Sequence, residues 1–392
     1  MELEFTDEQL ELRDNVRAVL EGQCPRSLVR AVYEGDAGAD EQVQALWSQV
    51  TELYWQGVAV PEEFGGLGLT YVELAIVAEE LGRATAPGPF LATVTQFAPL
   101  VLAVGDADAQ QRFLAPVAAG ERTGTVAFAE GDRWELDAVR TTATRTTDGW
   151  VLSGAKTTVL DGTTADDVAV IARDAASGAL GVFVVPGTAV KATARTVVDP
   201  TFVVTDLTLD GVVVPDSAVL AAPGTPGVEE QIERAWQEAT VAVALSTIGA
   251  CRKIFEDTLQ YAKDRVQYDK PIGSFQAIKH RLANMYLSLE RATALSYYAA
   301  LTIAEDDPRR AEAAALAKAA AGDCQRLLAT DGLQLHGGIG YTWEHDLHFW
   351  LKRAKTGEYL LGTATTHRAH LAQLLGLTPA TASTRTGPEV AA

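Results

Sequence analysis

Two polar segments of the chain combine residue types that suit the binding of an anion. The first runs from Arg265 to Gln276 (RVQYDKPIGSFQ), and the second runs from Gln334 to Thr342 (QLHGGIGYT). An arginine offers a planar fork of hydrogen-bond donors to a phosphate, and glycine-rich backbone lets an anion approach the amide N–H groups. Taken singly, Arg265 could instead cap a helix, and the glycines could form an ordinary turn between helices.

The elements that must position these segments follow from the spacing of the apolar residues. Helical spacing begins at Thr6, where Gln9 three residues later completes a capping-box pattern. The middle of the chain is rich in β-branched runs punctuated by Gly, Asp and Pro, and Asp148-Gly149 predicts a hairpin turn. Helical periodicity then returns. We therefore predict an N-terminal helical domain, a middle β domain, a C-terminal helical bundle and a flexible tail, at residues 1–122, 123–226, 227–377 and 378–392.

The predicted fold class is α+β, mainly α. Helices and strands segregate along the chain, which excludes a doubly wound nucleotide-binding fold. No G-x-G-x-x-G motif lies between a predicted strand and a predicted helix, so a Rossmann site is not expected.

Composition excludes several classes of partner. The 392 residues carry a formal net charge of −20, which argues against binding to nucleic acid or to an anionic membrane surface. Three scattered cysteines without a C-x-x-C pair predict neither a disulfide framework nor a metal site. No apolar stretch is long enough to span a bilayer, so we expect a cytoplasmic protein.

Together, and in this order, the motifs resemble the acyl-CoA dehydrogenase family over about residues 2–377. The matching patterns include Phe5-Thr6-Asp7-Glu8-Gln9, Val60-Pro61-Glu62-Glu63-Phe64-Gly65-Gly66-Leu67-Gly68, Glu79-Glu80-Leu81-Gly82 and Gly154-Ala155-Lys156. The resemblance implies an N-terminal helical domain, a middle β-barrel or sandwich and a C-terminal four-helix bundle, with FAD at a subunit interface. By this resemblance, Arg265 and Gln276 bind the pyrophosphate and adenine side of FAD. It also implies that Gln334, Gly337 and Gly338 approach the same dinucleotide from the neighbouring subunit, and that Thr363 lies near its adenosine half.

The chain departs from the family at the catalytic base. In the family reaction a carboxylate removes the α proton of an acyl-CoA thioester while the flavin takes the β hydride. The three positions that supply this carboxylate in different branches are Leu361, Ala239 and Ser246 in this chain. Glu238 is a weak candidate, because one residue turns a helical side chain by about 100°. Further polar residues nearby are interpreted as structural rather than catalytic: Glu358, Glu344, His336 and His345.

The chain also departs where the family contacts the flavin ring. The usual Trp and Thr are replaced in Lys156-Thr157-Thr158-Val159-Leu160, and the usual Thr-Glu-Pro stretch is replaced by Phe128-Ala129-Glu130-Gly131-Asp132. Asp269 adds a carboxylate beside the expected phosphate site, which is electrostatically unfavourable.

Because base and ring contacts are missing together, the chain resembles the base-lacking subunit of the steroid-degrading α2β2 branch. Segments such as Pro87-Gly88-Pro89-Phe90-Leu91-Ala92-Thr93 carry this closer resemblance. The implied partners are an acyl-CoA, such as a steroid side-chain CoA ester, a homologous base-bearing subunit and an acceptor such as electron-transfer flavoprotein. Two alternatives stay open: a self-sufficient homotetramer that uses Glu238, and a structural or regulatory protein without flavin.

Overall fold

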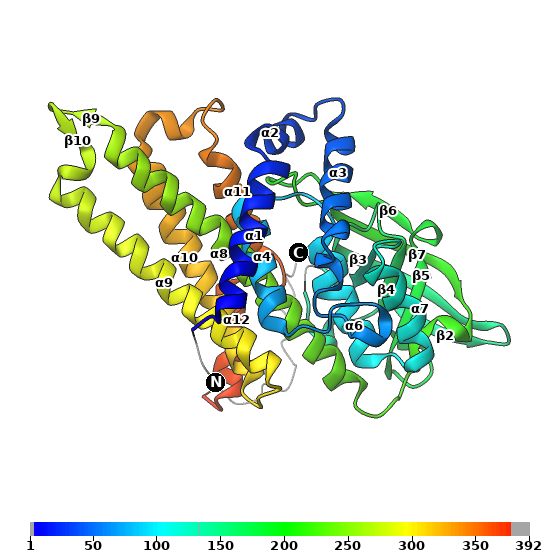
Figure 1. Cartoon of the computed structure of the whole chain (residues 1–392). Coiled ribbons are helices and arrows are strands. Elements are labelled where there is room, and N and C mark those ends of the chain that lie inside the picture. Colours follow the sequence, from blue (N-terminus) through cyan, green and yellow to red (C-terminus); the bar gives the residue numbers. More distant parts are fainter. Residues whose placement is uncertain (1–3, 132, 378–392) are drawn as a thin grey trace, which may run out of the picture.

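The structure, a computed structural model, describes residues 4–131 and 133–377; Asp132 and the predicted tail at 378–392 lie outside them. Helices come first, strands follow and helices return, which confirms the α+β, mainly α fold class. Figure 1 shows the long C-terminal helices on one side of the molecule and the strands on the other. In the part of the chain that is described, no helix combines the length and the apolarity needed to cross a membrane.

Helix α4 is buried along most of its length, and α1, α8 and α9 pack against it. Seven helices make up the N-terminal part. They are α1 (Asp7–Gln23), α2 (Arg26–Glu34), α3 (Ala39–Glu52), α4 (Tyr71–Ala84), α5 (Phe90–Ala92), α6 (Ala98–Val104) and α7 (Ala107–Ala118). The capping box predicted at the start of α1 is present: the Gln9 N–H donates to Thr6 Oγ1, and the Thr6 N–H donates to Gln9 Oε1. A second box, between Thr70 and Glu73, starts α4.

Eight strands form one sheet in the order β6-β7-β3-β2-β4-β5-β8, with β1 paired to β4. They are β1 (Gly124–Ala127), β2 (Thr142–Thr146), β3 (Gly149–Leu160), β4 (Asp167–Asp174), β5 (Leu180–Pro186), β6 (Lys191–Ala194), β7 (Val204–Val214) and β8 (Val219–Ala221). The rings of Trp150 on β3 and Phe183 on β5 have centroids 5.5 Å apart, although β2 and β4 separate these strands in the sheet. The sheet therefore curls around an apolar interior. The hairpin turn lies one residue earlier than predicted, because Gly149 already pairs with Thr146 as the first residue of β3.

The C-terminal part is built on α8, whose 37 residues span about 55 Å. Its helices are α8 (Val228–Asp264), α9 (Gln276–Ala304), α10 (Arg310–His336), α11 (Leu347–Tyr359) and α12 (Ala364–Leu374), and a short hairpin of β9 (Val266–Gln267) and β10 (Lys270–Pro271) joins α8 to α9. Two glycines let α4 and α8 touch. A Cβ at Gly82 would overlap the Ser246 carbonyl, and one at Gly249 would overlap the Glu79 carbonyl.

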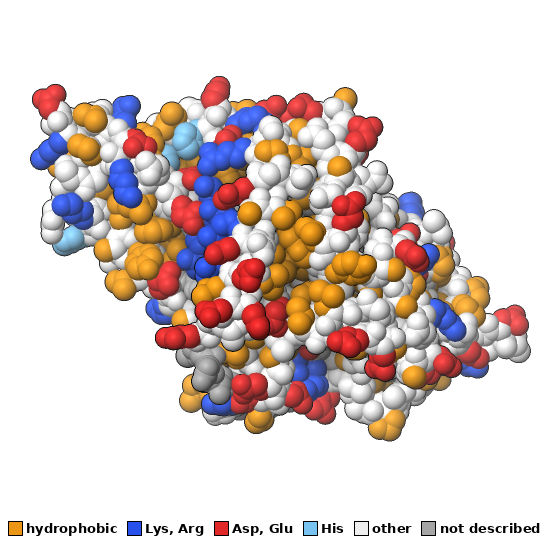
Figure 2. All heavy atoms as spheres, viewed as in Figure 1, with side chains coloured by type: hydrophobic (Ala, Val, Ile, Leu, Met, Phe, Trp, Pro, Cys, Tyr) orange, Lys and Arg blue, Asp and Glu red, His pale blue; other side chains and the backbone are white. Residues whose placement is uncertain are grey.

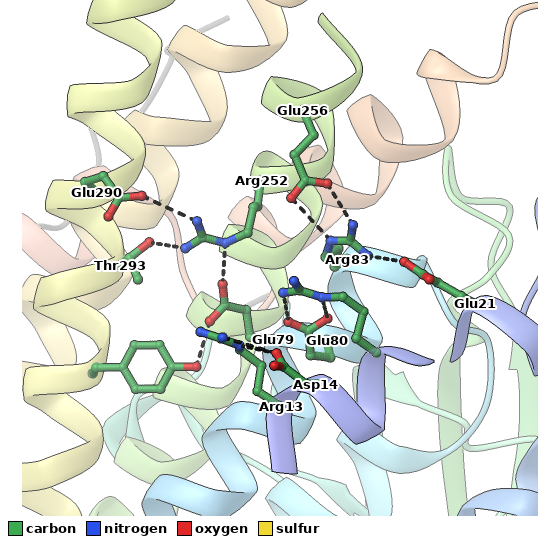
Figure 3. Close-up of polar contacts among 12 residues, drawn as sticks. Arg13, Asp14, Glu21, Glu79, Glu80, Arg83, Arg252, Glu256, Glu290 and Thr293 are labelled. Atoms are coloured by element: carbon green, nitrogen blue, oxygen red, sulfur yellow. Dashed lines mark hydrogen bonds and ion pairs between the residues drawn. The ribbon is translucent and has the colours of Figure 1, made fainter. Parts of the chain in front are cut away.

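Ion pairs fix α4 between α1 and the long helices (Figure 3). Glu79 accepts from Arg252 of α8 at 2.9 Å and from the Tyr297 hydroxyl of α9 at 2.6 Å. Glu80 accepts two hydrogen bonds from Arg17 of α1, at 2.6 and 3.0 Å. Both carboxylates are buried, so the Glu79-Glu80 pattern seen in the sequence has a structural role in this chain.

Candidate functional site

The structure brings the two anion-binding segments to the same end of the helical bundle. Arg265 follows the last residue of α8, and Gln334 to Gly338 span the end of α10. Tyr261 joins these ends, because its hydroxyl donates to the His336 carbonyl at 3.3 Å and its ring stacks on the His336 ring with centroids 4.5 Å apart. The two segments therefore lie close together within one chain. The expectation that the glycine segment reaches the dinucleotide of a neighbouring subunit stays a prediction.

This end of the bundle leaves donors and backbone open. The backbone N–H of Arg265 donates to the Tyr261 carbonyl at 2.8 Å. The backbone of Arg265 therefore caps α8, as the alternative to anion binding predicted. Its guanidinium, however, is exposed and makes no hydrogen bond or ion pair with another described residue. A Cβ at Gly337 or Gly338 would meet nothing within 4 Å, and Gly337 has a φ of +65°. An anion could thus approach the guanidinium and the backbone at Gly337 and Gly338, although the Gly337 N–H itself already donates to carbonyls of the last turn of α10.

Further polar residues of the two segments lie at this end of the bundle. Gln276 begins α9 and its Nε2 lies 2.8 Å from His280 Nε2, while the Gln334 side chain is exposed. Tyr268 and Asp269 form the turn between β9 and β10 with φ values of +52° and +61°. Asp is favoured in such left-handed turns, so Asp269 has a conformational reason to stand beside the expected phosphate site.

Thr363 lies away from this end within the same chain. It caps α12, where its Oγ1 accepts the Thr366 N–H at 3.3 Å. The start of α12 packs at Gly322 of α10, because a Cβ there would contact Ala364. Gly322 is four helical turns, about 20 Å, from His336 at the other end of α10. A single chain therefore does not bring Thr363 and Arg265 together.

All three family base positions are buried without a carboxylate. Ala239 is 0% exposed, Ser246 3% and Leu361 5%. Ala239 and Leu361 belong to one hydrophobic core, and Ser246 lies against α4 at Gly82. These side chains offer no group that could accept the α proton of a thioester.

The loop that carries Leu361 is held by a buried lysine that the sequence analysis did not single out. Lys318 Nζ donates to the Glu358 carbonyl at 2.8 Å and to the Gly362 carbonyl at 2.7 Å, and His367 Nε2 donates to the Leu361 carbonyl at 2.8 Å. Burial lowers the pKa of Lys318 to about 7 and that of His367 to about 4. A lone lysine inside an alanine-rich helix was the available sequence signal.

The alternative base, Glu238, forms an ion pair. Its Oε1 lies 2.9 Å from Arg310 Nη2 of α10, while the adjacent Ala239 faces the core. Burial raises the pKa of Glu238, and the Arg310 charge opposes this rise. Glu358 is likewise paired, with Lys355 at 2.6 Å. Both carboxylates therefore have structural partners.

The other polar residues of the late motif also make structural contacts. His336 Nδ1 lies 2.8 Å from the Gly332 carbonyl, His345 Nδ1 accepts the Leu347 N–H at 3.2 Å, and the Glu344 carbonyl accepts from Arg30 at 3.3 Å. Burial lowers the pKa of His336, which favours its neutral form.

The two ring-contact positions are engaged with protein groups. Thr158 has a φ of +53°, and its Oγ1 accepts from Arg195 at 3.2 Å. Leu160 is packed in the hydrophobic core with Phe202. The residues at the Arg265 end are thus open to an anionic ligand, whereas Thr158 and Leu160 do not reproduce the ring contacts that the resemblance implies.

Glu130, in the segment that replaces Thr-Glu-Pro, forms an ion pair with the buried Lys156. Its Oε1 lies 2.8 Å from Lys156 Nζ and accepts the Thr141 N–H at 2.9 Å. Burial lowers the pKa of Lys156 to about 8, although the Glu130 charge opposes this shift. The pair fixes β3 against the segment that follows β1.

A stripe of Lys and Arg side chains crosses one face of the molecule beside α1 (Figure 2). A cavity of about 190 Å³ is lined there by Arg17, Arg83, Lys253 and Trp350 among others. These three cations are ion-paired with Glu80, Glu256 and Asp257 respectively, and the fourth cation of the lining, Arg26, pairs with Asp257 and Asp346. Every cation that lines the cavity is therefore already paired with a carboxylate, unlike Arg265.

Two family models and a curated relative match this chain over most of its length. Residues 6–121 match the family model "Acyl-CoA dehydrogenase, N-terminal domain", and residues 230–376 match "Acyl-CoA dehydrogenase, C-terminal domain". The acyl-CoA dehydrogenase IpdE2 of Mycobacterium tuberculosis is 32% identical over 359 residues, which cover 91% of this chain and 93% of that relative.

Two solved assemblies are similar in fold. The ChsE4-ChsE5 complex from Mycobacterium tuberculosis contains a chain with a TM-score of 0.84 and 26% identity, over 97% of this chain and 100% of that one. A variant of the Tcur3481-Tcur3483 steroid ACAD contains one with a TM-score of 0.83 and 28% identity, over 96% of this chain and 99% of that one.

Proposed function

Because the chain belongs to the acyl-CoA dehydrogenase family, we propose that it is the base-lacking subunit of a heteromeric, FAD-dependent acyl-CoA dehydrogenase. The observation that carries this proposal is a contrast within one chain. The three base positions are buried and lack a carboxylate, whereas the Arg265 and Gly337 end remains open. The chain keeps groups that suit a dinucleotide and lacks those that suit the proton transfer.

In this proposal the chain's own residues bind and orient. Arg265 holds the FAD pyrophosphate, which approaches the open backbone at Gly337 and Gly338, and Gln276 and Gln334 contact its adenine side. Thr363, which lies far from Arg265 within one chain, contacts adenosine bound by another subunit. FAD, when bound, supplies the hydride acceptor. A carboxylate of the homologous partner takes the α proton.

The relatives support the substrate class and the assembly. One similar structure is the ChsE4-ChsE5 complex, and the other is a variant of the Tcur3481-Tcur3483 steroid ACAD. We therefore propose a steroid side-chain CoA ester as substrate and electron-transfer flavoprotein as the electron acceptor.

Co-expression with a homologous dehydrogenase chain that has Glu at a family base position tests the proposal. We expect a stable complex that contains FAD and oxidises a steroid acyl-CoA, and a purified single chain without turnover. Replacing the partner's base by Gln should abolish turnover while FAD is retained. Normal turnover by the single chain would contradict the proposal.

The homotetramer alternative makes a different prediction for Glu238→Gln. If Glu238 were the base, the single chain would be active and the variant would lose turnover without losing FAD. Under our proposal, Glu238→Gln leaves the turnover of the complex unchanged, because Glu238 serves to pair Arg310. A complex without a flavin absorption band would favour the third interpretation, a structural or regulatory subunit.

A further inference from the structure

The end of the bundle that carries the β9-β10 hairpin is basic, although the protein as a whole is strongly acidic. Residues 263–281, which we call the basic tip, hold five Lys or Arg and two Asp. Their formal charge is therefore +3, which leaves −23 on the rest of the chain. Figure 1 places the hairpin at one extremity of the molecule, and Figure 2 shows Lys and Arg side chains gathered on that extremity.

Most cations of the basic tip have no partner inside the protein. Four of them are exposed, and their side chains make no hydrogen bond or ion pair with another described residue: Lys263, Arg265, Lys270 and Lys279. The fifth, Arg281, pairs with Asp331 at 3.1 Å. The cations that line the cavity beside α1 are, in contrast, all paired. The basic tip therefore presents positive charge that the fold does not neutralise.

Helix stability explains only one of these four cations. Lys263 lies in the last turn of α8, where a positive charge interacts favourably with the helix dipole. Lys279 lies in the first turn of α9, which has no acidic residue, so its charge opposes the dipole there. Lys270 belongs to the short strand β10, and its Nζ lies 4.5 Å from the centroid of the exposed-side Phe275 ring. The charges of Lys270 and Lys279 are thus available to a group outside the chain.

Apolar side chains project from the same basic tip. Tyr268, in the hairpin turn, is 87% exposed, and Val266 is 52% exposed. An exposed aromatic residue among cations is typical of a protein interface, where the ring becomes an anchor and the charges steer the approach. A small free anion would use the cations but would leave Tyr268 and Val266 in water. The combination therefore favours a protein partner.

The charge on the rest of the chain limits which anionic partner fits. Nucleic acids and anionic membranes are extended polyanions, so they would reach beyond the basic tip onto a chain that carries −23. An acidic patch on a folded protein can match the basic tip alone, because salt screens exposed charges beyond about 8 Å under physiological conditions. Charge complementarity thus selects a protein with a local acidic patch.

Resting on the proposed function, we propose that the basic tip docks onto an acidic patch of the base-bearing subunit. Arg265 belongs to the tip and is the residue expected to hold the FAD pyrophosphate, so docking here brings the partner to the shared cofactor. Lys263, Lys270 and Lys279 speed the encounter between the two chains. Tyr268 becomes buried at the interface and slows their dissociation.

The association kinetics of the two full-length subunits test the charges. Raising NaCl from about 50 to about 500 mM should slow wild-type association at least tenfold, because salt screens the attraction. The double variant Lys270→Glu, Lys279→Glu should associate at least tenfold more slowly at physiological salt, with a similar dissociation rate. The control is Lys191→Glu, which reverses an exposed cation of β6 without a described ion pair and should associate at the wild-type rate.

Tyr268→Asn tests the anchor separately from the charges. Asn tolerates the φ of +52° at this position, so the hairpin should keep its turn. The variant should dissociate at least tenfold faster while its association rate stays close to wild type. Circular dichroism verifies that each variant is folded. An unchanged dissociation rate would remove Tyr268 from the interface and contradict the proposed docking.

Two results would overturn the docking surface and leave the proposed function standing. One is a complex that forms at a rate independent of salt and of the Lys270→Glu, Lys279→Glu change; if FAD affinity alone fell in that variant, the cations would belong to the cofactor site. The other is binding to phosphatidylserine vesicles that the double variant loses while subunit association persists, which would assign the tip to a lipid surface. Failure of the two chains to form any complex would contradict the docking surface and the proposed function together.

Discussion

The ammonium group of Lys318 lies 2.7 Å from the carbonyl oxygen of Gly362 and 2.8 Å from that of Glu358. A lysine of α10 thus donates hydrogen bonds to two carbonyl groups at and just beyond the end of α11. The loop between Glu358 and Gly362 places Leu361 at a φ of +59°, a conformation that costs a non-glycine residue free energy. This scaffold positions residue 361 although the side chain there is not a base.

Lys318→Met should change how stability depends on pH. Burial lowers the pKa of Lys318 from 10.5 to about 7, so between these values the unfolded chain binds a proton that the folded chain does not. The wild-type protein therefore loses stability as the pH falls from 10.5 to 7, by at most about 1.4 kcal/mol per pH unit. Denaturant unfolding at pH 7 and 9.5 should show this slope in the wild-type protein and not in Lys318→Met.

Lys355→Met is the matched control for Lys318. Lys355 is partly exposed and pairs with Glu358, which raises its pKa above 10.5 and outside this window. The control should keep the wild-type slope. If the unfolding free energies of Lys318→Met and the wild-type protein changed with pH in parallel, Lys318 would not be the source of the slope.

Asp161→Asn should stabilise the protein at neutral and alkaline pH. Burial raises the pKa of Asp161 from 3.8 to about 7, so the folded chain holds a proton that the unfolded chain releases. Stability is lost as the pH rises from about 4 to 7, and the uncharged amide avoids this loss. We expect a gain on the order of 2 kcal/mol at pH 8 and little change at pH 4.

Chemical denaturation at pH 4 and pH 8 measures this difference. Asn tolerates the φ of +53° that residue 161 adopts, so backbone strain should not mask it. The control is Asp148→Asn, in the exposed turn before β3. This change should leave the free energy of unfolding unaltered at both pH 4 and pH 8. A variant that is less stable than the wild-type protein at pH 8 would show that the carboxylate has a partner that outweighs its burial.

Gly249→Ala should disrupt the contact between α4 and α8. The added Cβ would overlap the Glu79 carbonyl, and both helices are held from several sides. We expect a loss of about 3 kcal/mol or more of unfolding free energy. The same change at Gly22 of α1, where a Cβ would meet nothing within 4 Å, should instead stabilise by about 0.5 to 1 kcal/mol. Equal Tm values for the two variants would contradict this packing.

Arg265→Met should weaken FAD binding by the complex without changing its Tm. The guanidinium is exposed and makes no described contact that supports the fold, so its loss removes only ligand contacts. Loss of a charge-assisted pair should raise the Kd about tenfold or more, measured by flavin fluorescence during dilution. Arg13→Met should leave FAD binding unchanged. An unaltered Kd in Arg265→Met would remove Arg265 from the cofactor site.

Local sequence signals predicted several elements correctly because their physics is local. The Thr6 and Gln9 box starts α1 as expected, and helical periodicity resumes near residue 227, one residue before α8 begins. Helix caps and amphipathic periods depend on residues a few positions apart. The turn before β3 was misplaced by one residue, because its register depends on pairing with Thr146.

The sequence by itself determined that Leu361, Ala239 and Ser246 carry no carboxylate, since side-chain chemistry is a property of the residue alone. Only the tertiary structure decided that Arg265 and Gly337 share one end of the bundle while Thr363 does not. It also decided that Lys318 and Arg353, ordinary charges in the sequence, are buried. Burial and proximity arise from contacts between residues far apart in the chain, and these contacts set both the available hydrogen-bond donors and the pKa values.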